Sequence, residues 1–534
     1  PKAWPPPTPD IDVEAAWSPH DPPYLADPPA VIDISIGRQL FVDTFLIDTL
    51  TDAEIEYFNA SWIGPVITPD RAWELNPQSP YPHSPYSKAF SGGVWFNPIS
   101  QEFQAWYNCG WGGGVCYATS ADGLVFEKPA LGIVKDAPIG VEGWNVSVSG
   151  DSNIILMNDP SRLSWGGTWD SHVTIDGSCV WMDLDDPDRC SRYKLMTVGA
   201  HGSAGSQYAF WASPDGVNFT LITNSSTTIG DRSSFFFNPF RKKWCYSIKI
   251  TGTPWGRSRW YRETDNLFTG THWNESEAVL WTHADRLDPP FLSGDADGTA
   301  LPPRGRGPTC PDSSSNNVNA SVCQAELYNL DASPVESLMV GLFSIFQGMG
   351  NLDRSNQYTH DEYNSIHLGF SRDGFHWFRP SGPQQNVTIC DHCSAPSNYS
   401  ARLPFMSFDR STLGKCSAAH PEACAWNSYN IQSVGGGLIV MGDEFRFYAS
   451  ADSGNNANGQ QGNSSTGVAK LRRDGFAAVR CRDSEPQCSL LTRPLVAAGR
   501  PRLFVNADAR AGSLRVAVLS ADSGAILPGY SEAD

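Results

Sequence analysis

One short phrase, Ser-x-Asp-Gly followed by an apolar and often aromatic stretch, recurs along the chain and constrains its fold most. Copies occur at 120–126, 213–219 and 371–377, with a weaker copy at 473–476, and each follows a β-forming run. An Asp-Gly pair between apolar runs is typical of a tight hairpin turn, because Gly accepts positive φ and Asp bonds its own backbone. Hairpins repeated at such intervals are typical of propeller blades. The aspartates of the phrase are therefore expected to be structural residues of outer turns: Asp122, Asp215, Asp373 and Asp474.

Five β-rich blocks can be traced, beginning near Phe90, His172, Asp231, Leu327 and Ile431. The 48 Gly and 40 Pro supply many turns, and long apolar stripes with helical period are scarce. We therefore predict an all-β fold, a five-bladed β-propeller, in which the first strand of every blade surrounds one central pocket.

The predicted domain limits follow from composition. A Pro-rich extended segment covers 1–30, the propeller covers 31–485, and a C-terminal β segment covers 486–534. Within the last segment, 502–506 and 513–519 have the pattern of two strands and look like the beginning of an incomplete β-sandwich.

The net charge of −19 argues against nucleic acid and anionic membranes as partners. The chain contains no apolar run of about 18 residues, so no membrane span is expected. Nothing in the sequence predicts a cofactor.

Twelve of the 13 cysteines fall into pairs of close sequence neighbours, which predicts short-range disulfides and an oxidising compartment. The four cysteines between 390 and 424 allow three pairings, which stay open, and the Cys-x-x-Cys among them is interpreted as a disulfide element rather than a zinc site because sequons flank it. Cys245 is left over and is expected to be a buried apolar filler. The predicted disulfide cysteines are Cys109, Cys116, Cys179, Cys190, Cys310, Cys323, Cys390, Cys393, Cys416, Cys424, Cys481 and Cys488.

Nine Asn-x-Ser/Thr sequons support the same compartment and predict a secreted, extracellular glycoprotein. No signal peptide precedes Pro1, so we expect the chain to begin at a processed end or to lack its start. The candidate glycosylation sites are Asn59, Asn145, Asn218, Asn224, Asn274, Asn319, Asn386, Asn398 and Asn463.

A set of phrases spread over residues 33–530 resembles one family. The phrases lie at 36–43, 90–95, 236–240, 336–343, 370–377 and 503–508. Together they resemble the secreted glycoside hydrolase family 32-like proteins, relatives of the invertase and arabinanase five-bladed propellers. The resemblance implies a five-bladed propeller, usually completed by a C-terminal β-sandwich, and a carbohydrate ligand. The Trp-Met-Asn-Asp-Pro-Asn-Gly, Arg-Asp-Pro and Glu-Cys motifs of true invertases are not intact in this chain.

Glycoside hydrolysis needs two carboxyl groups that face one pocket. Glu336 stands alone before a strongly apolar strand and is the predicted general acid; the alternative is a solvated strand-entry residue. Asp231, before the apolar run at 235–237, and Asp176 are the predicted nucleophile, base or pKa modulator. Their alternatives are an ion pair for Asp231 and a turn residue for either.

Sugars bind to aromatic faces and to polar groups that read hydroxyls. The candidate binding residues are Glu74, Trp111, His172, Arg232 and Gln432, each of which also has a structural interpretation.

Two hypotheses follow. The first is an extracellular glycosidase that uses these carboxyl groups. The second is a non-catalytic propeller, a glycoprotein of a cell coat or extracellular filament that self-assembles; the missing invertase motifs, the sequons and the cysteine-rich loops favour it.

Overall fold

The computed structural model describes residues 4–5, 18–75, 85–110, 113–135, 138–141, 144–148, 150–157, 174–201, 205–225, 229–253, 255–288, 325–347, 363–382, 388–390, 393–394, 402–409, 425–453, 463–499, 502–510 and 512–533. The chain forms two compact units. One consists of Pro1–Pro22 with Tyr57–Phe476, and the other of Pro23–Glu56 with Ala477–Asp534. The division differs from the domain limits predicted from composition, because residues 31–56 and 477–485 belong to the unit that holds the C-terminal segment.

The larger unit contains five antiparallel sheets of three to five strands, which correspond to the five predicted blocks. Blade 1 consists of β5 (Ser87–Lys88), β6 (Val94–Asn97), β7 (Glu102–Cys109), β8 (Gly114–Ser120) and β11 (Ile154–Met157). Blade 2 consists of β12 (Thr174–Met182), β13 (Tyr193–His201), β14 (Gly205–Ser213) and β15 (Thr220–Asn224). Blade 3 consists of β16 (Ser234–Asn238), β17 (Lys243–Thr253), β18 (Gly256–Thr264) and β19 (Val279–Thr282).

Blade 4 consists of β20 (Glu326–Val335), β21 (Leu338–Gln347) and β22 (Tyr363–Ser371). Blade 5 consists of β25 (Tyr429–Met441), β26 (Glu444–Asp452), β27 (Ser464–Arg472) and β4 (Ser61–Ile67). The smaller elements of this unit are α3 (Ala72–Leu75), the hairpin β9–β10 (Pro138–Val141, Trp144–Ser147), the hairpin β23–β24 (Thr388–Cys390, Cys393–Ser394) and 3₁₀ turns at Arg189–Ser191, Thr269–Thr271 and Glu275–Glu277.

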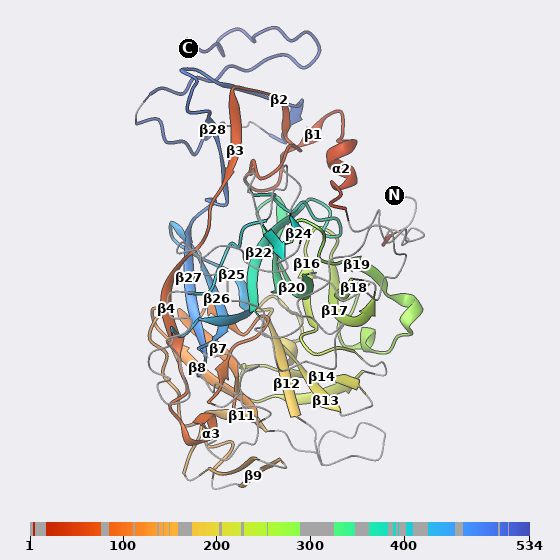
Figure 1. Cartoon of the computed structure of the whole chain (residues 1–534), viewed down its shortest axis with the longest axis vertical. Coiled ribbons are helices and arrows are strands. Elements are labelled where there is room, and N and C mark those ends of the chain that lie inside the picture. The colour runs from red at the N-terminus through yellow and green to blue at the C-terminus, as the bar shows by residue number, and fades with distance from the viewer. Residues whose placement is uncertain are drawn as a thin grey trace. The chain divides into compact units, whose positions relative to one another are not determined.

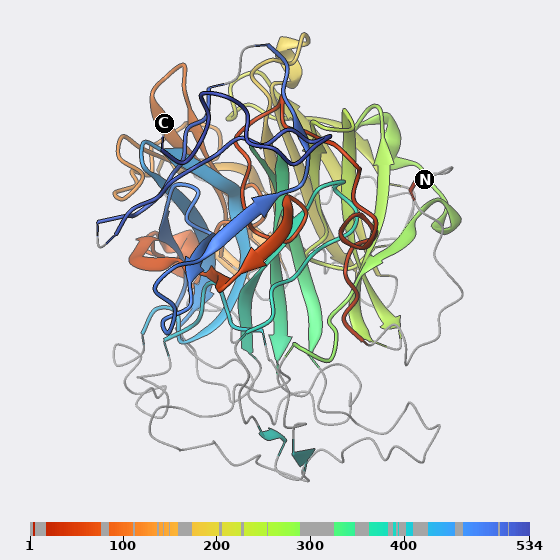
Figure 2. The same ribbon diagram turned by 90° about the horizontal axis from the view of Figure 1, so that it is seen from above.

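The five sheets form a closed ring. The inner strands β12, β16, β20 and β25 contact one another in succession, β25 contacts β6, and β12 contacts β7 (Figures 1 and 2). The ring is closed by β4, which comes from the N-terminal part of the chain and pairs with β27 as the last strand of blade 5. The predicted all-β, five-bladed propeller is therefore confirmed.

The smaller unit contains the short helix α2 (Pro23–Ala26) and three strand pairs. These pairs are β1 (Ile32–Asp33) with β30 (Leu495–Val496), β2 (Ile47–Thr51) with β29 (Ser489–Thr492), and β3 (Ala53–Tyr57) with β28 (Ala477–Cys481). The strands predicted at 502–506 and 513–519 are absent from the described residues, where only the bridge Leu519–Ile526 forms. A strand needs partners and a covered face, and Phe504 is 85% exposed, so the prediction of a sandwich start is not confirmed.

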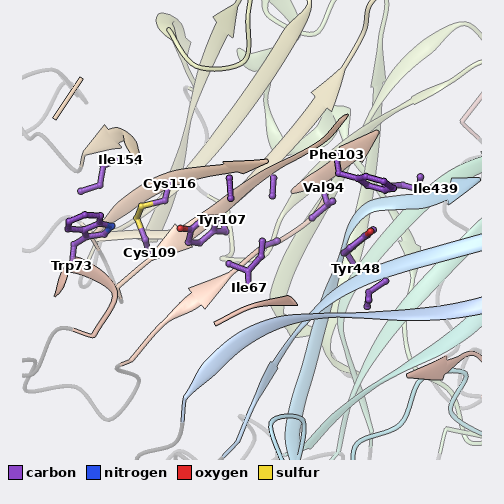
Figure 3. Packing of buried hydrophobic residues seen from close by; sticks show 14 of the residues in the cluster. Ile67, Trp73, Val94, Phe103, Tyr107, Cys109, Cys116, Ile154, Ile439 and Tyr448 are labelled. Carbon is purple, nitrogen blue, oxygen red and sulfur yellow. A yellow bond between two sulfur atoms is a disulfide. The ribbon is translucent and has the colours of Figure 1, made fainter. Parts of the chain in front are cut away.

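The blades share apolar cores (Figure 3). In the cluster between blades 1 and 5, Phe103 lies 6.1 Å from Tyr448, and Val94 and Ile439 pack in the same cluster. The predicted disulfide Cys109–Cys116 joins β7 to β8 in this core, as Figure 3 shows.

The predicted disulfide Cys481–Cys488 is also present, but a bond between Cys179 and Cys190 is not. Cys179 is buried inside β12, where its thiol donates to the Phe235 carbonyl, whereas Cys190 is exposed in a 3₁₀ turn. Cys245 is free and buried, as expected. Cys310, Cys323, Cys416 and Cys424 lie outside the described residues; Cys390 and Cys393 face each other in the register of β23 and β24.

The repeated aspartates close the turns that follow the third strands. In blade 2, Asp215 Oδ1 accepts from the backbone N–H of Val217 (2.9 Å) and of Asn218 (2.8 Å), and Gly216 has φ +78°. Asp122 and Asp373 accept the equivalent bonds. The predicted structural role of Asp122, Asp215 and Asp373 is confirmed.

Replacing Asp215 by Ala is expected to lower the free energy of unfolding by roughly 1–2 kcal/mol, because two backbone donors lose their acceptor. Urea unfolding monitored by tryptophan fluorescence measures the change. Asp185→Ala, an exposed carboxylate of the same blade, is the control and should change stability by less than about 0.5 kcal/mol. Equal losses in both variants would contradict the assigned role.

Candidate functional site

A cluster of charged side chains lies where the inner strands begin. Asp231 and Arg232 occupy the turn before β16, Asp176 is the third residue of β12, Tyr328 the third of β20, and Gln432 the fourth of β25. Inner strands of neighbouring blades contact each other, so their equivalent ends meet at the propeller axis. The structure thus brings together four of the sequence-predicted residues: Asp176, Asp231, Arg232 and Gln432.

Asp231 is held by two neighbours. The Lys249 ammonium pairs with Oδ1, and the Tyr328 hydroxyl donates to Oδ2 at 3.1 Å. Lys249 Nζ also lies 4.2 Å from the centre of the Tyr328 ring. Burial opposes ionisation, but the Lys249 and Arg232 cations outweigh it and hold the pKa of Asp231 well below its usual range. Asp231 is therefore ionised at neutral pH.

For the carboxyl group of Asp176, burial outweighs the neighbouring cations, so its pKa is raised. Burial raises the pKa of its carboxyl to about 6, even though Arg232 Nη1 lies 3.2 Å from Oδ1 and favours the charged form. The Asp231 carboxylate raises this pKa further by repulsion. Both carboxyl groups reach the surface, with side chains 12% exposed for Asp176 and 28% for Asp231. The cluster therefore holds a carboxyl group that gives up its proton near pH 6 beside one that is already ionised at that pH.

Sequence reasoning missed a third carboxylate of this end, Glu326. It is the first residue of β20, it is buried, and Arg257 Nη1 lies 2.5 Å from its Oε2. Gly256, at φ +70°, leaves the space this carboxylate needs, since a Cβ there would stand 2.1 Å from Glu326 Oε1. The sequence places the beginning of the fourth block at Leu327, one residue after Glu326. A comparison of the residues at which the five blocks begin could therefore have found Glu326.

Glu336, the predicted general acid, does not lie in this cluster. It occupies the turn between β20 and β21, at φ +53°, and lies 3.9 Å from Arg473. Eight positions of extended chain separate it from Tyr328, a distance of about 26 Å. Glu336 lies at the far end of the strand whose beginning contacts Asp231.

Glu74 is a structural residue rather than a rim residue. Its side chain is fully buried and accepts from the backbone N–H of Asp70 and Arg71, from Tyr107 Oη at 2.7 Å and from Lys128 Nζ at 2.7 Å. These contacts fix the start of α3 against blade 1.

Trp111 and His172 lie outside the described residues, as do the sequons at Asn319, Asn386 and Asn398. Asn59, Asn218, Asn274 and Asn463 are exposed, Asn224 is half-buried in β15, and Asn145 lies in β10. Over the part of the chain that the structure describes, no group of three or more potential ligands gathers as a metal site, and no helix has the length and apolarity of a membrane span.

No protein-family model and no curated protein matches the chain. Among solved structures it is similar to an N-acetylgalactosamine deacetylase from F. plautii, at 13% identity over 77% of this chain and 95% of that one, with a TM-score of 0.43. It is also similar to a thermostable family-43 glycoside hydrolase (10% identity, 75% and 98% of the chains, TM-score 0.39) and to a GH32 β-fructofuranosidase of Bombyx mori (9%, 80% and 66%, TM-score 0.37).

Proposed function

We propose that the chain is a glycoside hydrolase-like propeller that binds a carbohydrate at the axial cluster and cleaves a glycosidic bond there. The observation that carries the proposal is the opposite tuning of two neighbouring carboxyl groups. The pKa of Asp176 is raised to about 6 and that of Asp231 is lowered, which are the states that an acid and a nucleophile or base need at mildly acidic pH.

The residues have distinct roles in this proposal. Protonated Asp176 donates its proton to the glycosidic oxygen as the bond breaks. Ionised Asp231 attacks the anomeric carbon or activates a water molecule, and Lys249 and Tyr328 keep its carboxylate charged and oriented. Glu326 and its partner Arg257 belong to the same end of the axis and support Tyr328, whose ring centre lies 5.3 Å from the Arg257 guanidinium.

The pH dependence tests these roles. Because Asp176 must be protonated, activity is expected to fall as pH rises through about 6, by about tenfold per unit above it. Because the pKa of Asp231 is lowered, the acidic limb is expected below pH 3.8. The measurement is kcat/KM against pH on a cleaved glycan.

Asp176→Asn should reduce hydrolysis of a natural glycan by about 10²–10⁴-fold and remove the limb near pH 6. On an aryl glycoside with an activated leaving group, which needs no proton, the same variant should lose far less. Equal losses on both substrates would refute the acid role.

We further propose that the protein is secreted and glycosylated. The disulfides Cys109–Cys116 and Cys481–Cys488 suit an oxidising compartment, and the sequons at Asn59, Asn218, Asn274 and Asn463 are accessible to glycosylation. Mass spectrometry of the protein from a secreting host, before and after removal of N-glycans, tests this.

A further inference from the structure

We propose that Arg232 is a positioning residue: its backbone and its guanidinium hold Asp231 and Asp176 in one charged cluster at the beginning of the inner strands, and it does not itself bind the substrate. This inference rests on the proposed function, within which the sequence had suggested Arg232 as a ligand-binding residue.

The backbone supplies the first argument. In extended chain, consecutive side chains point to opposite sides. Asp231 and Arg232 are consecutive, yet Asp231 meets Lys249 and Tyr328 while Arg232 meets Asp176 in the same charged cluster. Arg232 has φ +60°, a left-handed conformation that a side chain other than Gly adopts at a cost. This turn lets both side chains contact the same charged cluster.

The guanidinium supplies the second argument. It lies 3.2 Å from Asp176 Oδ1, donates through Nε to Gln432 Oε1 at 3.1 Å, and sits 4.2 Å above the Phe90 ring. Its partners thus come from blades 1, 2 and 5, and its own carbonyl accepts from Arg259 Nη2 at 2.9 Å. The side chain is only 7% exposed, so its donors are directed to protein groups. Arg232 therefore fixes the position of Asp176 relative to Asp231.

Several charged or titratable groups act on Asp176: Arg232 from the turn before β16, Asp231 beside it, Lys249 from β17, Lys88 and Tyr86 from the β5 region, and Tyr328 from β20. Arg232 makes the direct contact. Removing its charge leaves burial and the Asp231 carboxylate, which raise the pKa of Asp176, opposed by the Lys249 cation, so the Asp176 proton should be held more tightly.

The test compares Arg232→Gly with Arg232→Lys. Gly adopts positive φ freely, so the first variant keeps the turn and deletes the whole side chain, guanidinium included. Lys keeps the charge but lacks the planar fork that contacts Asp176 and Gln432 together. Gln101→Gly, at φ +58° in the outer turn between β6 and β7, is the matched control for a left-handed position and should leave activity unchanged.

The readouts are the alkaline limb of the activity profile and the Asp176 carboxyl pKa from ¹³C NMR titration, assigned with Asp176→Asn. We expect Arg232→Gly to raise both by about one pH unit or more and to lower kcat by about tenfold or more, with little change in KM. Arg232→Lys should keep the limb near its wild-type position while kcat stays low.

A loss confined to KM, or an Asp176 pKa that is the same in Arg232→Gly and wild type, would overturn the positioning role and favour direct substrate binding. If no glycan is hydrolysed at all, the proposed function fails. The NMR titration still decides the positioning role in that case, because it needs no substrate.

Discussion

Asp231→Asn is expected to lower glycan hydrolysis by about 10³-fold or more. The Asn side-chain amide carries no negative charge, so it can neither attack the anomeric carbon nor activate a water molecule. It also leaves the buried Lys249 ammonium without its ionic partner. Initial rates on a cleaved glycan measure the loss, and circular dichroism checks that the fold is intact.

Glu336→Gln is the matched control for Asp231→Asn. Because Glu336 stands at the far end of β20, the substitution should leave the rate within about twofold of wild type. A loss in Glu336→Gln comparable with that in Asp231→Asn would mean that the reacting groups do not lie at the beginning of the inner strands.

Trp106→Ala is expected to lower the free energy of unfolding by about 3–5 kcal/mol, the largest stability effect we predict. Trp106 in β7 is fully buried, and its indole N–H donates to the Gly216 carbonyl at 2.6 Å. Its ring lies 5.6 Å from both Tyr117 and Tyr193. The substitution removes this packing and leaves a cavity between blades 1 and 2.

Denaturant unfolding measures the Trp106→Ala effect. Val125→Ala is the control, since Val125 is 71% exposed and its truncation should cost less than about 0.5 kcal/mol. If Trp106→Ala cost no more than this control, the blades would not depend on their shared core.

The repeat predicted the blades because its chemistry is local. A Ser-x-Asp-Gly turn closes through hydrogen bonds between residues at most three positions apart, such as Asp373 with Phe375 and His376. All the interacting residues are therefore close together in the sequence. The sequence also identified Asp231 correctly as a residue that precedes an inner strand. Local sequence patterns could not predict that β4 closes the ring, because β4 pairs with a strand about 400 positions away.

Two of the sequence expectations differ from the observed structure for the same physical reason. Glu336 precedes an apolar run, which suggested an inner strand. That run is β21, the second strand of its blade, and it begins at the opposite end of the blade from β20. Cys179 and Cys190 are close in sequence, yet Cys179 is buried within β12 and Cys190 is exposed in a turn. In both cases sequence spacing gave proximity along the chain and not the direction in which a side chain points.

Glycosidic cleavage by Asp176 and Asp231 can be tested without knowing the substrate. The wild-type protein is incubated at about pH 5 with a panel of oligosaccharides and polysaccharides, and new reducing ends are measured. Asp231→Asn, treated in parallel, gives the background. We expect release from at least one glycan class by wild type and none above background by the variant. A protein that binds glycans but releases no reducing ends from any of them, or one whose release persists in Asp231→Asn, would contradict it and favour the non-catalytic extracellular propeller.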